Sequence, residues 1–247
     1  MKRLFGSRPE DPEIAESDAE AGPIGADYDS LRAAFTAAVS HELRTPLARL
    51  LVLLESAHLP EADVESLIEQ ARGEVEQMTE LVDDILFLSE LETQPDGGSP
   101  ERTRALPILR EVLDSLQERA ALAGVTLVAA GDEDVDLPLS PRMLWTVAEN
   151  LAENAIRYAG PGSTFEVSAR RESDHIVLAG SDDGAGVNEA DLARLFERFY
   201  RADRARASRG SGLGLAIVKH VVGAAGGTVE AAGARGRGLS VRCAFPA

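Results

Sequence analysis

The pair His41 and Glu42 combines the two side-chain types that a phosphoryl-acceptor site needs. A neutral imidazole accepts a phosphoryl group near pH 7, and an adjacent carboxylate can hold the other ring proton and raise the nucleophilicity of the attacking nitrogen. Pro46, shortly after, removes a backbone donor from a helical segment and should bend it, which is tolerated at a site but costly elsewhere. These residues indicate a candidate site for phosphorylation.

A second cluster, Asn150 and Asn154, lies one helical turn apart on one face of a predicted helix, with Arg157 and Tyr158 following. An amide oxygen can ligate Mg²⁺ without adding charge, and a guanidinium can bind phosphate. Taken alone, two asparagines at this spacing would also suit surface or capping positions, so the pair gains meaning only from its neighbours.

A third cluster follows a predicted strand and includes Asp182, Gly184 and Gly186. Its glycines permit close approach of the backbone to a ligand, and one carboxylate can accept a hydrogen bond from an adenine amino group. An acidic turn is the alternative. A dinucleotide-binding loop is disfavoured because Asp182 and Asp183 would repel a pyrophosphate.

A fourth cluster begins at Arg198 and Arg201 and continues into a glycine-rich segment. Such a segment suits a mobile lid over phosphates, with backbone donors at the start of the next helix completing an anion site; a solvated loop is the alternative. A Walker A loop is absent because Lys219 lacks the required preceding pattern. The candidate residues at the end of this cluster are Gly210, Gly212, Leu213 and Gly214.

Two helices must position His41. Apolar residues of the first recur at intervals of four and three, at Phe35, Val39, Leu43, Pro46, Leu50, Leu53 and Ala57. His41 lies two residues beyond Val39, about 200° around the helix, and therefore points away from this apolar seam. A break at Leu59 and Pro60 precedes a second run with the same spacing, Ile68, Ala71, Val75, Met78, Val82 and Ile85. We expect an antiparallel helical hairpin that dimerises into a four-helix bundle, since two helices cannot bury both stripes.

The other three clusters belong to a predicted α+β domain. Its helices are expected at 105–123, 143–158 and 213–222, and its strands at 125–129, 165–169, 176–179, 228–231 and 239–245. The expected organisation is an acidic disordered leader or linker at 1–26, the hairpin domain at 27–93, a linker rich in Pro and Gly at 94–104, and the α+β domain at 105–247.

Length, charge and composition limit the classes of protein to which this chain can belong. A length of 247 residues suits two modest domains, and a net charge of −17 argues against a nucleic-acid partner. The single cysteine, Cys243, lies in an apolar run and is expected to be buried. The strongly apolar stretch Leu50–Leu54 is too short to span a bilayer. The chain as given is therefore expected to be cytoplasmic, either by itself or as the soluble part of a membrane-bound receptor.

The segment from His41 to Leu47, His-Glu-Leu-Arg-Thr-Pro-Leu, resembles the H box of the sensor histidine kinases. The remaining clusters resemble, in the order of that family, its N box, first glycine box, F box and second glycine box. Together these resemblances cover about residues 30 to 247. Departures occur at Ser140, where many relatives have Asp, at Arg157, where Lys is usual, and at Ala225, which replaces a frequent His.

The resemblance implies that the α+β domain is an α/β sandwich of the type shared with gyrase-type ATPases. It implies that His41 accepts the phosphoryl group, that Glu42 is its acid–base partner and that Thr45 orients water when a response regulator is dephosphorylated. It further implies that Asn154 ligates Mg²⁺ and that Asp182 reads adenine. The implied partners are a second copy of the chain and the receiver domain of a response regulator.

The expected activity is ATP-dependent phosphorylation of His41 followed by transfer to an aspartate of the regulator. ATP-hydrolysing relatives of this fold place a Glu where this chain has Asn150, and an amide cannot accept a proton from water. Glu149 and Glu153 are each one residue away from the helix face that carries Asn150 and Asn154, about 100° around the helix. Two alternatives stay open, a non-catalytic nucleotide-binding scaffold and a protein that mainly dephosphorylates its regulator.

Overall fold

The computed structural model describes residues 23–93, 102–202 and 210–247. Its contacts divide the chain into two units, Met1–Ser40 and His41–Ala247. In the first unit the described part is the beginning of helix α1 (Pro23–Ser56). The second unit contains the rest of α1, helix α2 (Val64–Thr93) and a sheet domain.

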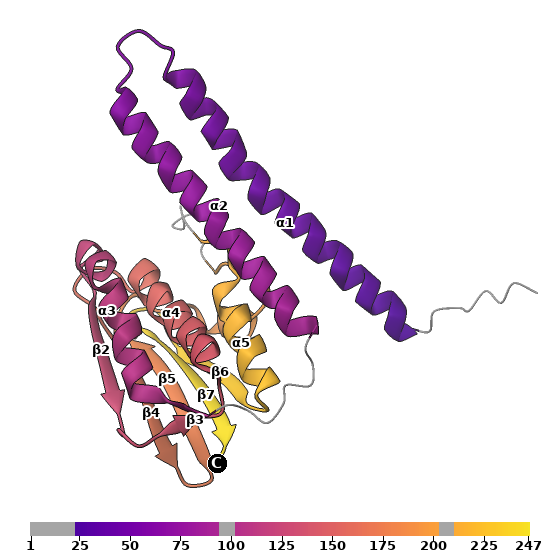
Figure 1. Cartoon of the computed structure of the whole chain (residues 1–247), viewed down its shortest axis with the longest axis vertical. Helices are drawn as coiled ribbons and strands as arrows, with labels where there is room; N and C mark the ends of the chain where they lie inside the picture. The colour runs from indigo at the N-terminus through magenta and orange to yellow at the C-terminus, as the bar shows by residue number, and fades with distance from the viewer. Residues whose placement is uncertain (1–22, 94–101, 203–209) are drawn as a thin grey trace, which may run out of the picture. The chain divides into compact units, whose positions relative to one another are not determined.

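Residues 41–56 of α1 and the whole of α2 form an antiparallel hairpin (Figure 1). Asp63 caps α2, since its carboxylate accepts the Ser66 backbone N–H at 3.1 Å. An ion pair between Arg49 and Glu74, 3.4 Å apart, links the two helices. The predicted hairpin is therefore present.

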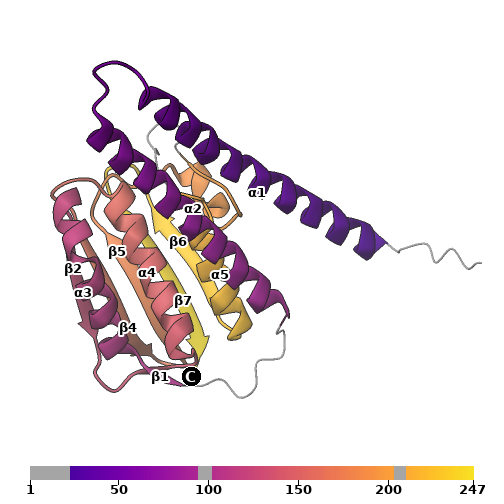
Figure 2. The ribbon, with the colours of Figure 1, turned by 45° about the horizontal axis from the view of Figure 1, so that its top comes forward.

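The sheet domain is built on five strands in the order β2-β4-β5-β7-β6. β2 (Thr126–Gly131) pairs in parallel with β4 (Thr164–Glu172), whereas β5 (His175–Asp182), β7 (Leu239–Pro246) and β6 (Thr228–Gly233) continue the sheet through antiparallel pairs. The helices α3 (Ala105–Ala123), α4 (Pro141–Tyr158) and α5 (Gly214–Ala224) lie against the same face of the sheet (Figures 1 and 2). The expected α+β class with a helix-on-sheet sandwich is confirmed.

The core lies between these helices and the sheet. Alternate residues of β4, namely Phe165, Val167 and Ala169, are buried, as expected for a strand with one covered face. Phe245 of β7 is fully buried. Cys243 is buried as predicted, and burial raises the pKa of its thiol to about 12.

Several boundaries differ from the prediction. Helix α1 begins at Pro23 rather than near Asp27; the expected disordered leader otherwise falls outside the described residues. Thr103 and Arg104, predicted to be linker, form the short strand β1 (Thr103–Arg104), which pairs with β3 (Asp136–Leu137). The 3₁₀ helix η1 (Glu189–Arg194) was also not predicted. Elements this short carry too few residues to show a hydrophobic period.

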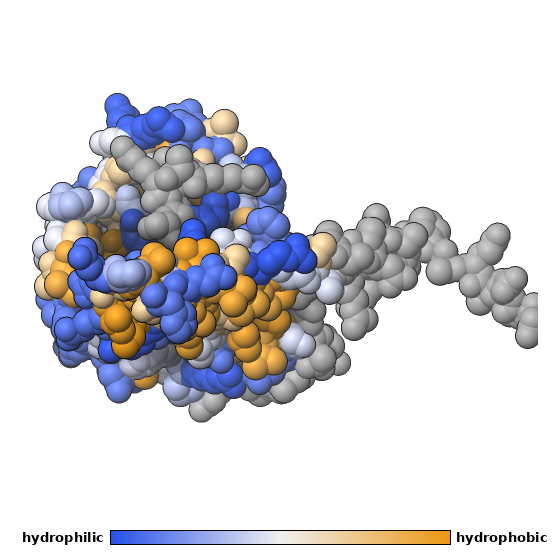
Figure 3. Space-filling view, turned by 90° about the horizontal axis from the view of Figure 1, so that it is seen from above, coloured by the Kyte–Doolittle hydropathy of each residue, from blue (hydrophilic) through white to orange (hydrophobic). Residues whose placement is uncertain are grey.

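Many apolar side chains of the hairpin are exposed to solvent. Ile68 is 64% exposed, and Val75 and Val82 of the same predicted seam are also exposed. Figure 3 shows hydrophobic surface gathered among hydrophilic residues on the face seen from above. Within the described ranges, no helix has both the length and the apolar character that crossing a membrane requires.

Candidate active site

His41 lies on the surface of α1, with 75% of its side chain exposed. Its Nδ1 atom is 3.4 Å from Oε1 of Glu42, and the Thr45 hydroxyl donates to the His41 carbonyl oxygen at 3.4 Å. The prediction that this histidine points away from packed side chains is therefore consistent with the structure. The Nδ1 edge of the ring faces the carboxylate, and Nε2 lies on the opposite edge of the ring.

Most of the predicted nucleotide-site residues line a cavity of about 620 Å³. It is lined by α4, the residues after β5, the two segments 200–202 and 210–215, and the inner faces of the hairpin helices. The predicted site residues in this lining are Glu42, Asn150, Asn154, Arg157, Tyr158, Asp182, Gly186, Arg201, Gly210, Gly212 and Gly214. The lining does not include His41, Thr45, Gly184, Arg198 or Leu213.

Helix α4 carries the two asparagines into the cavity. Ser140 precedes the helix as its N-cap, and its hydroxyl accepts the Met143 backbone N–H at 3.3 Å. Asn150 donates from Nδ2 to the Thr146 carbonyl at 2.8 Å, which fixes the orientation of its amide. Its Oδ1 lies against Gly214, where a side chain would collide with it. Asn150 therefore joins the start of α5 to the cavity wall.

Asp182 is held at the end of β5. Its Oδ1 accepts the Gly184 backbone N–H at 2.9 Å. Burial raises the pKa of Asp182, and backbone hydrogen bonds from Gly184 and Leu239 oppose that rise. Gly184 is required for packing rather than for lining the cavity, since a Cβ there would collide with the Ala159 carbonyl oxygen. A carboxylate fixed in a half-buried wall is suited to recognise a hydrogen-bond donor of a ligand.

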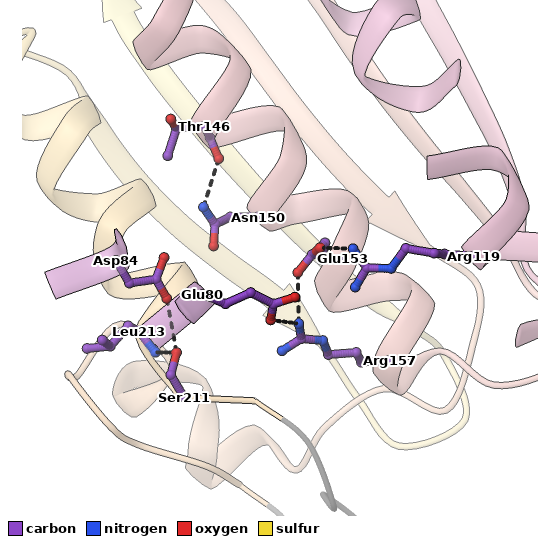
Figure 4. A network of polar contacts seen from close by, with 9 residues as sticks. All are labelled: Glu80, Asp84, Arg119, Thr146, Asn150, Glu153, Arg157, Ser211 and Leu213. Atoms are coloured by element: carbon purple, nitrogen blue, oxygen red, sulfur yellow. Dashed lines mark hydrogen bonds and ion pairs between the residues drawn. The ribbon is translucent and has the colours of Figure 1, made fainter. Parts of the chain in front are cut away.

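Arg157 lies at the centre of a charged network (Figure 4). Its Nη2 donates to Oε2 of Glu153 at 2.9 Å and to Oε2 of Glu80 at 3.2 Å. Arg119 of α3 donates from Nη1 to Oε1 of Glu153 at 2.6 Å. Sequence reasoning did not connect Arg119 or Glu80 with this site, because both are distant from Arg157 along the chain.

A second contact in Figure 4 joins α2 to the glycine-rich segment. The Ser211 hydroxyl donates to Oδ2 of Asp84 at 3.1 Å and accepts the Leu213 backbone N–H at 3.2 Å. Burial raises the pKa of Asp84 to about 6; Glu153 and Glu80 add to the rise, whereas Ser211 and Arg157 oppose it. Asp84 was not predicted as a site residue, since no local motif marks it.

The residues on both sides of 203–209 lie close together. Phe199 has a φ of 62° and donates its backbone N–H to the Gly212 carbonyl at 2.9 Å. The Tyr200 hydroxyl donates to Asp191 at 2.6 Å, which raises the pKa of Tyr200, and Arg194 stacks on its ring at 4.1 Å. The central part of the predicted lid, 203–209, falls outside the described residues.

Two family models match the chain. The model described as "His Kinase A (phospho-acceptor) domain" matches residues 31–94, and the model described as "Histidine kinase-, DNA gyrase B-, and HSP90-like ATPase" matches residues 140–247. The chain belongs to the sensor histidine kinases. The second match identifies the sheet domain of this histidine kinase as an ATP-binding domain.

Individual relatives agree with this family. The sensor-like histidine kinase SenX3 of Mycobacterium tuberculosis (strain ATCC 25618 / H37Rv) is 36% identical over 230 residues, which cover 90% of this chain and 56% of SenX3. The solved structure of Acinetobacter baumannii histidine kinase AdeS has a TM-score of 0.67 and 26% identity, and covers 83% of this chain and 97% of AdeS.

A structure of histidine kinase ThkA in complex with response regulator protein TrrA shares the fold, with a TM-score of 0.66 and 17% identity, over 90% of this chain and 63% of that one. This histidine kinase chain spans about half the length of the first curated relatives it matches.

Proposed function

We propose that this chain uses Mg-ATP to phosphorylate its own His41 and then transfers the phosphoryl group to an aspartate in the receiver domain of a response regulator. The observation that carries the proposal is the exposed His41 imidazole beside Glu42, in the same chain as an ATP-binding domain whose cavity collects Asn150, Asn154, Arg157 and Asp182. Each of these groups suits one part of phosphoryl transfer.

In this proposal the cavity binds the nucleotide through its predicted residues. Asp182 accepts a hydrogen bond from the adenine amino group, and Arg157 binds a phosphate. Asn154 supplies an amide oxygen that would hold Mg²⁺, and the ion would supply positive charge to offset the negative charge of the phosphates. Gly186, Gly210, Gly212 and Gly214 line the cavity at places where neighbouring protein atoms leave no room for a Cβ.

The first chemical step forms a bond between Nε2 of His41 and the γ-phosphorus as the bond from that phosphorus to the β–γ bridging oxygen breaks, and ADP leaves. Glu42 holds the proton on Nδ1 and stabilises the positive charge that develops on the ring. In the second step a carboxylate oxygen of the regulator's aspartate replaces His41 on phosphorus, which returns the neutral imidazole.

Water is a poor competitor as the acceptor. Asn150 cannot act as a general base, and both oxygens of Glu153 are bonded to arginines. Glu149 also lines the cavity, and burial raises its pKa. A Glu149→Gln variant is therefore the control for any ATP hydrolysis that does not pass through His41.

We propose that the chain acts as a homodimer on the cytoplasmic side of the membrane. The proposed units are the dimerisation and phosphotransfer domain at 27–93 and the catalytic domain at 105–247, joined by a linker. The exposed apolar residues of the hairpin, Leu51, Ile68, Val75 and Val82 among them, would be buried by a second hairpin. The ThkA–TrrA complex is consistent with a response regulator as the second partner.

The test is incubation of the purified chain and its His41→Ala variant with Mg²⁺ and γ-labelled ATP, followed by denaturing gels after acid or alkali. We expect a label that is stable to alkali, labile to acid and absent from the variant. A chain that binds ATP without becoming labelled would support the scaffold alternative. Regulator dephosphorylation without labelling of His41 would support the phosphatase alternative, for which Thr45 is the residue to replace.

A further inference from the structure

Arg119 is a surface residue of α3 that reaches into the nucleotide cavity. Its side chain is 46% exposed, yet it lines the same cavity as Asn154 and Arg157. Its Nη1 is 2.6 Å from Oε1 of Glu153, a residue only 20% exposed. A contact this short to a largely buried carboxylate is stronger than an ordinary surface ion pair.

Glu153 is bonded to a different arginine through each oxygen. Oε1 accepts from Arg119, and Oε2 accepts from Arg157, which lies one turn further along α4. Without Arg119, the pair of Glu153 and Arg157 would be electrically neutral. The Glu153 carboxylate would then be held only by Arg157, and the two side chains could move together. With Arg119 the three groups carry a net charge of +1, and the position of Glu153 is held from the far side.

The two terminal nitrogens of Arg157 face different surroundings. Nη2 donates to the carboxylates of Glu153 and Glu80, whereas Nη1 lies 2.9 Å from the place where a Cβ would stand on Gly210. Gly210 begins the glycine-rich segment that lines the cavity. The contacts of Nη2 with Glu153 and Glu80 therefore determine that Nη1 faces the glycine-rich segment.

Two further carboxylates, those of Glu149 and Glu80, add negative charge near Arg119 and Arg157. Glu149, one turn before Glu153, lines the cavity, and the charge of Arg119 lowers a pKa that burial and Glu153 raise. Glu80 is 51% exposed, so an incoming phosphate can displace it from Arg157 more readily than it can displace Glu153. Arg119 is thus a second cation, in addition to Arg157, that offsets the acidic residues of α4.

We propose that Arg119 is a positioning residue for the nucleotide phosphates. It acts through Glu153 to hold Arg157 toward the glycine-rich segment, and its own charge offsets the negative charge of Glu153. The inference rests on the proposed role of Arg157 in binding ATP, and it adds a residue outside the family's motifs. It does not depend on which group finally accepts the phosphoryl group.

The test compares Arg119→Gln with Arg110→Gln, which replaces another exposed arginine of α3 that forms a long ion pair with Glu133, at 3.9 Å. Calorimetry on the full chain would measure binding of adenosine, ADP and ATP with Mg²⁺. For Arg119→Gln we expect ATP affinity to fall about fivefold to tenfold and adenosine affinity to stay within about twofold, because only the phosphates sense the cation. Arg110→Gln should bind all three ligands as the parent does.

A second variant distinguishes positioning from structural damage. If Arg119 acts through Glu153, replacing Arg119 by Gln in a Glu153→Gln background should change ATP affinity by less than about twofold, because the residue through which it acts is already gone. Autophosphorylation by Arg119→Gln should show a higher KM for ATP with kcat nearly unchanged. Arg119→Lys should retain more affinity than the glutamine variant.

Equal losses of adenosine and ATP affinity, or unchanged ATP affinity, would overturn the inference. Failure of the proposed function has a different signature. If Arg157→Gln itself leaves ATP affinity unchanged, then Arg157 does not bind phosphate and the inference falls with it. If ATP binds normally but His41 is never labelled, the kinase proposal fails while the comparison of adenosine with ATP still tests Arg119.

Discussion

The helical hairpin and the sheet domain build their sites in different ways. In the hairpin the candidate residues His41, Glu42 and Thr45 lie within one turn of helix, and many apolar side chains around them are exposed. In the sheet domain most apolar residues are buried, and its part of the cavity lining extends from Arg119 to Leu239. A local motif can thus carry the acceptor on a helix that needs a partner, whereas nucleotide binding requires a complete core.

The largest expected effect separates the two regions. His41→Gln should abolish labelling of the chain, a loss of at least about 10³-fold, while ATP affinity stays within twofold of the parent. Glutamine keeps a polar side chain but has no nucleophilic nitrogen. Gel autoradiography and calorimetry on the same preparation would check both halves. Retained labelling would show that another residue is the acceptor.

The next effect concerns the core of the sheet domain. Phe245→Ala should destabilise that domain by about 3–5 kcal/mol, because the residue is fully buried and the surrounding strands cannot close the cavity. Ile68→Ala on the hairpin, 64% exposed, is the matched control and should cost less than about 1 kcal/mol in a monomer. Urea denaturation followed by circular dichroism would compare them. Similar losses in the free energy of unfolding would show that the hairpin and the sheet domain do not differ in how much their apolar side chains stabilise the fold.

A pH-dependent effect is expected at Asp84, where α2 contacts Ser211 of the sheet domain. Its pKa is raised from 3.8 to about 6, so the folded state favours the protonated carboxyl. Asp84 therefore lowers stability progressively as pH rises from about 4 to 6, and the cost is complete above that window.

Asp84→Asn removes this titration while an amide oxygen can still accept from Ser211. We expect the variant to be more stable than the parent by on the order of 1–3 kcal/mol at pH 7.5 and to match it near pH 4. Denaturation curves of both proteins across this range give the difference directly, and Asp83→Asn, on the exposed neighbour, is the control. A constant difference at all pH values would show that Asp84 does not titrate in this window.

The smallest expected effect is at Glu80, the hairpin residue that shares Arg157 with Glu153. Glu80→Gln should raise ATP affinity about twofold to threefold, because one competing carboxylate is removed from a half-exposed ion pair. Glu76→Gln, one turn earlier on α2 and paired with Arg72, should have no effect. An unchanged or weaker affinity in Glu80→Gln would mean that Glu80 does not compete with the nucleotide.

The sequence by itself determined the family, the fold class and most helices and strands. The family and fold predictions are confirmed. They could be made from the sequence because the H box is contiguous and because long amphipathic helices and alternating strands show clear hydrophobic periods. The site assignments stay predictions, although the structure brings Asn150, Asn154, Arg157 and Asp182 to one cavity. Helix spacing also predicted the exposure of His41.

Only the tertiary structure decided which distant side chains meet. Asp84 contacts Ser211 across 127 residues, and Arg119 contacts Glu153 across 34. The tertiary structure also shows that Gly184, Arg198 and Leu213 do not line the cavity. Local sequence carries no signal for such contacts, because each depends on how helices pack on the sheet. Propensity and periodicity act within one element, whereas a network such as that of Arg157 exists only after several elements have packed together.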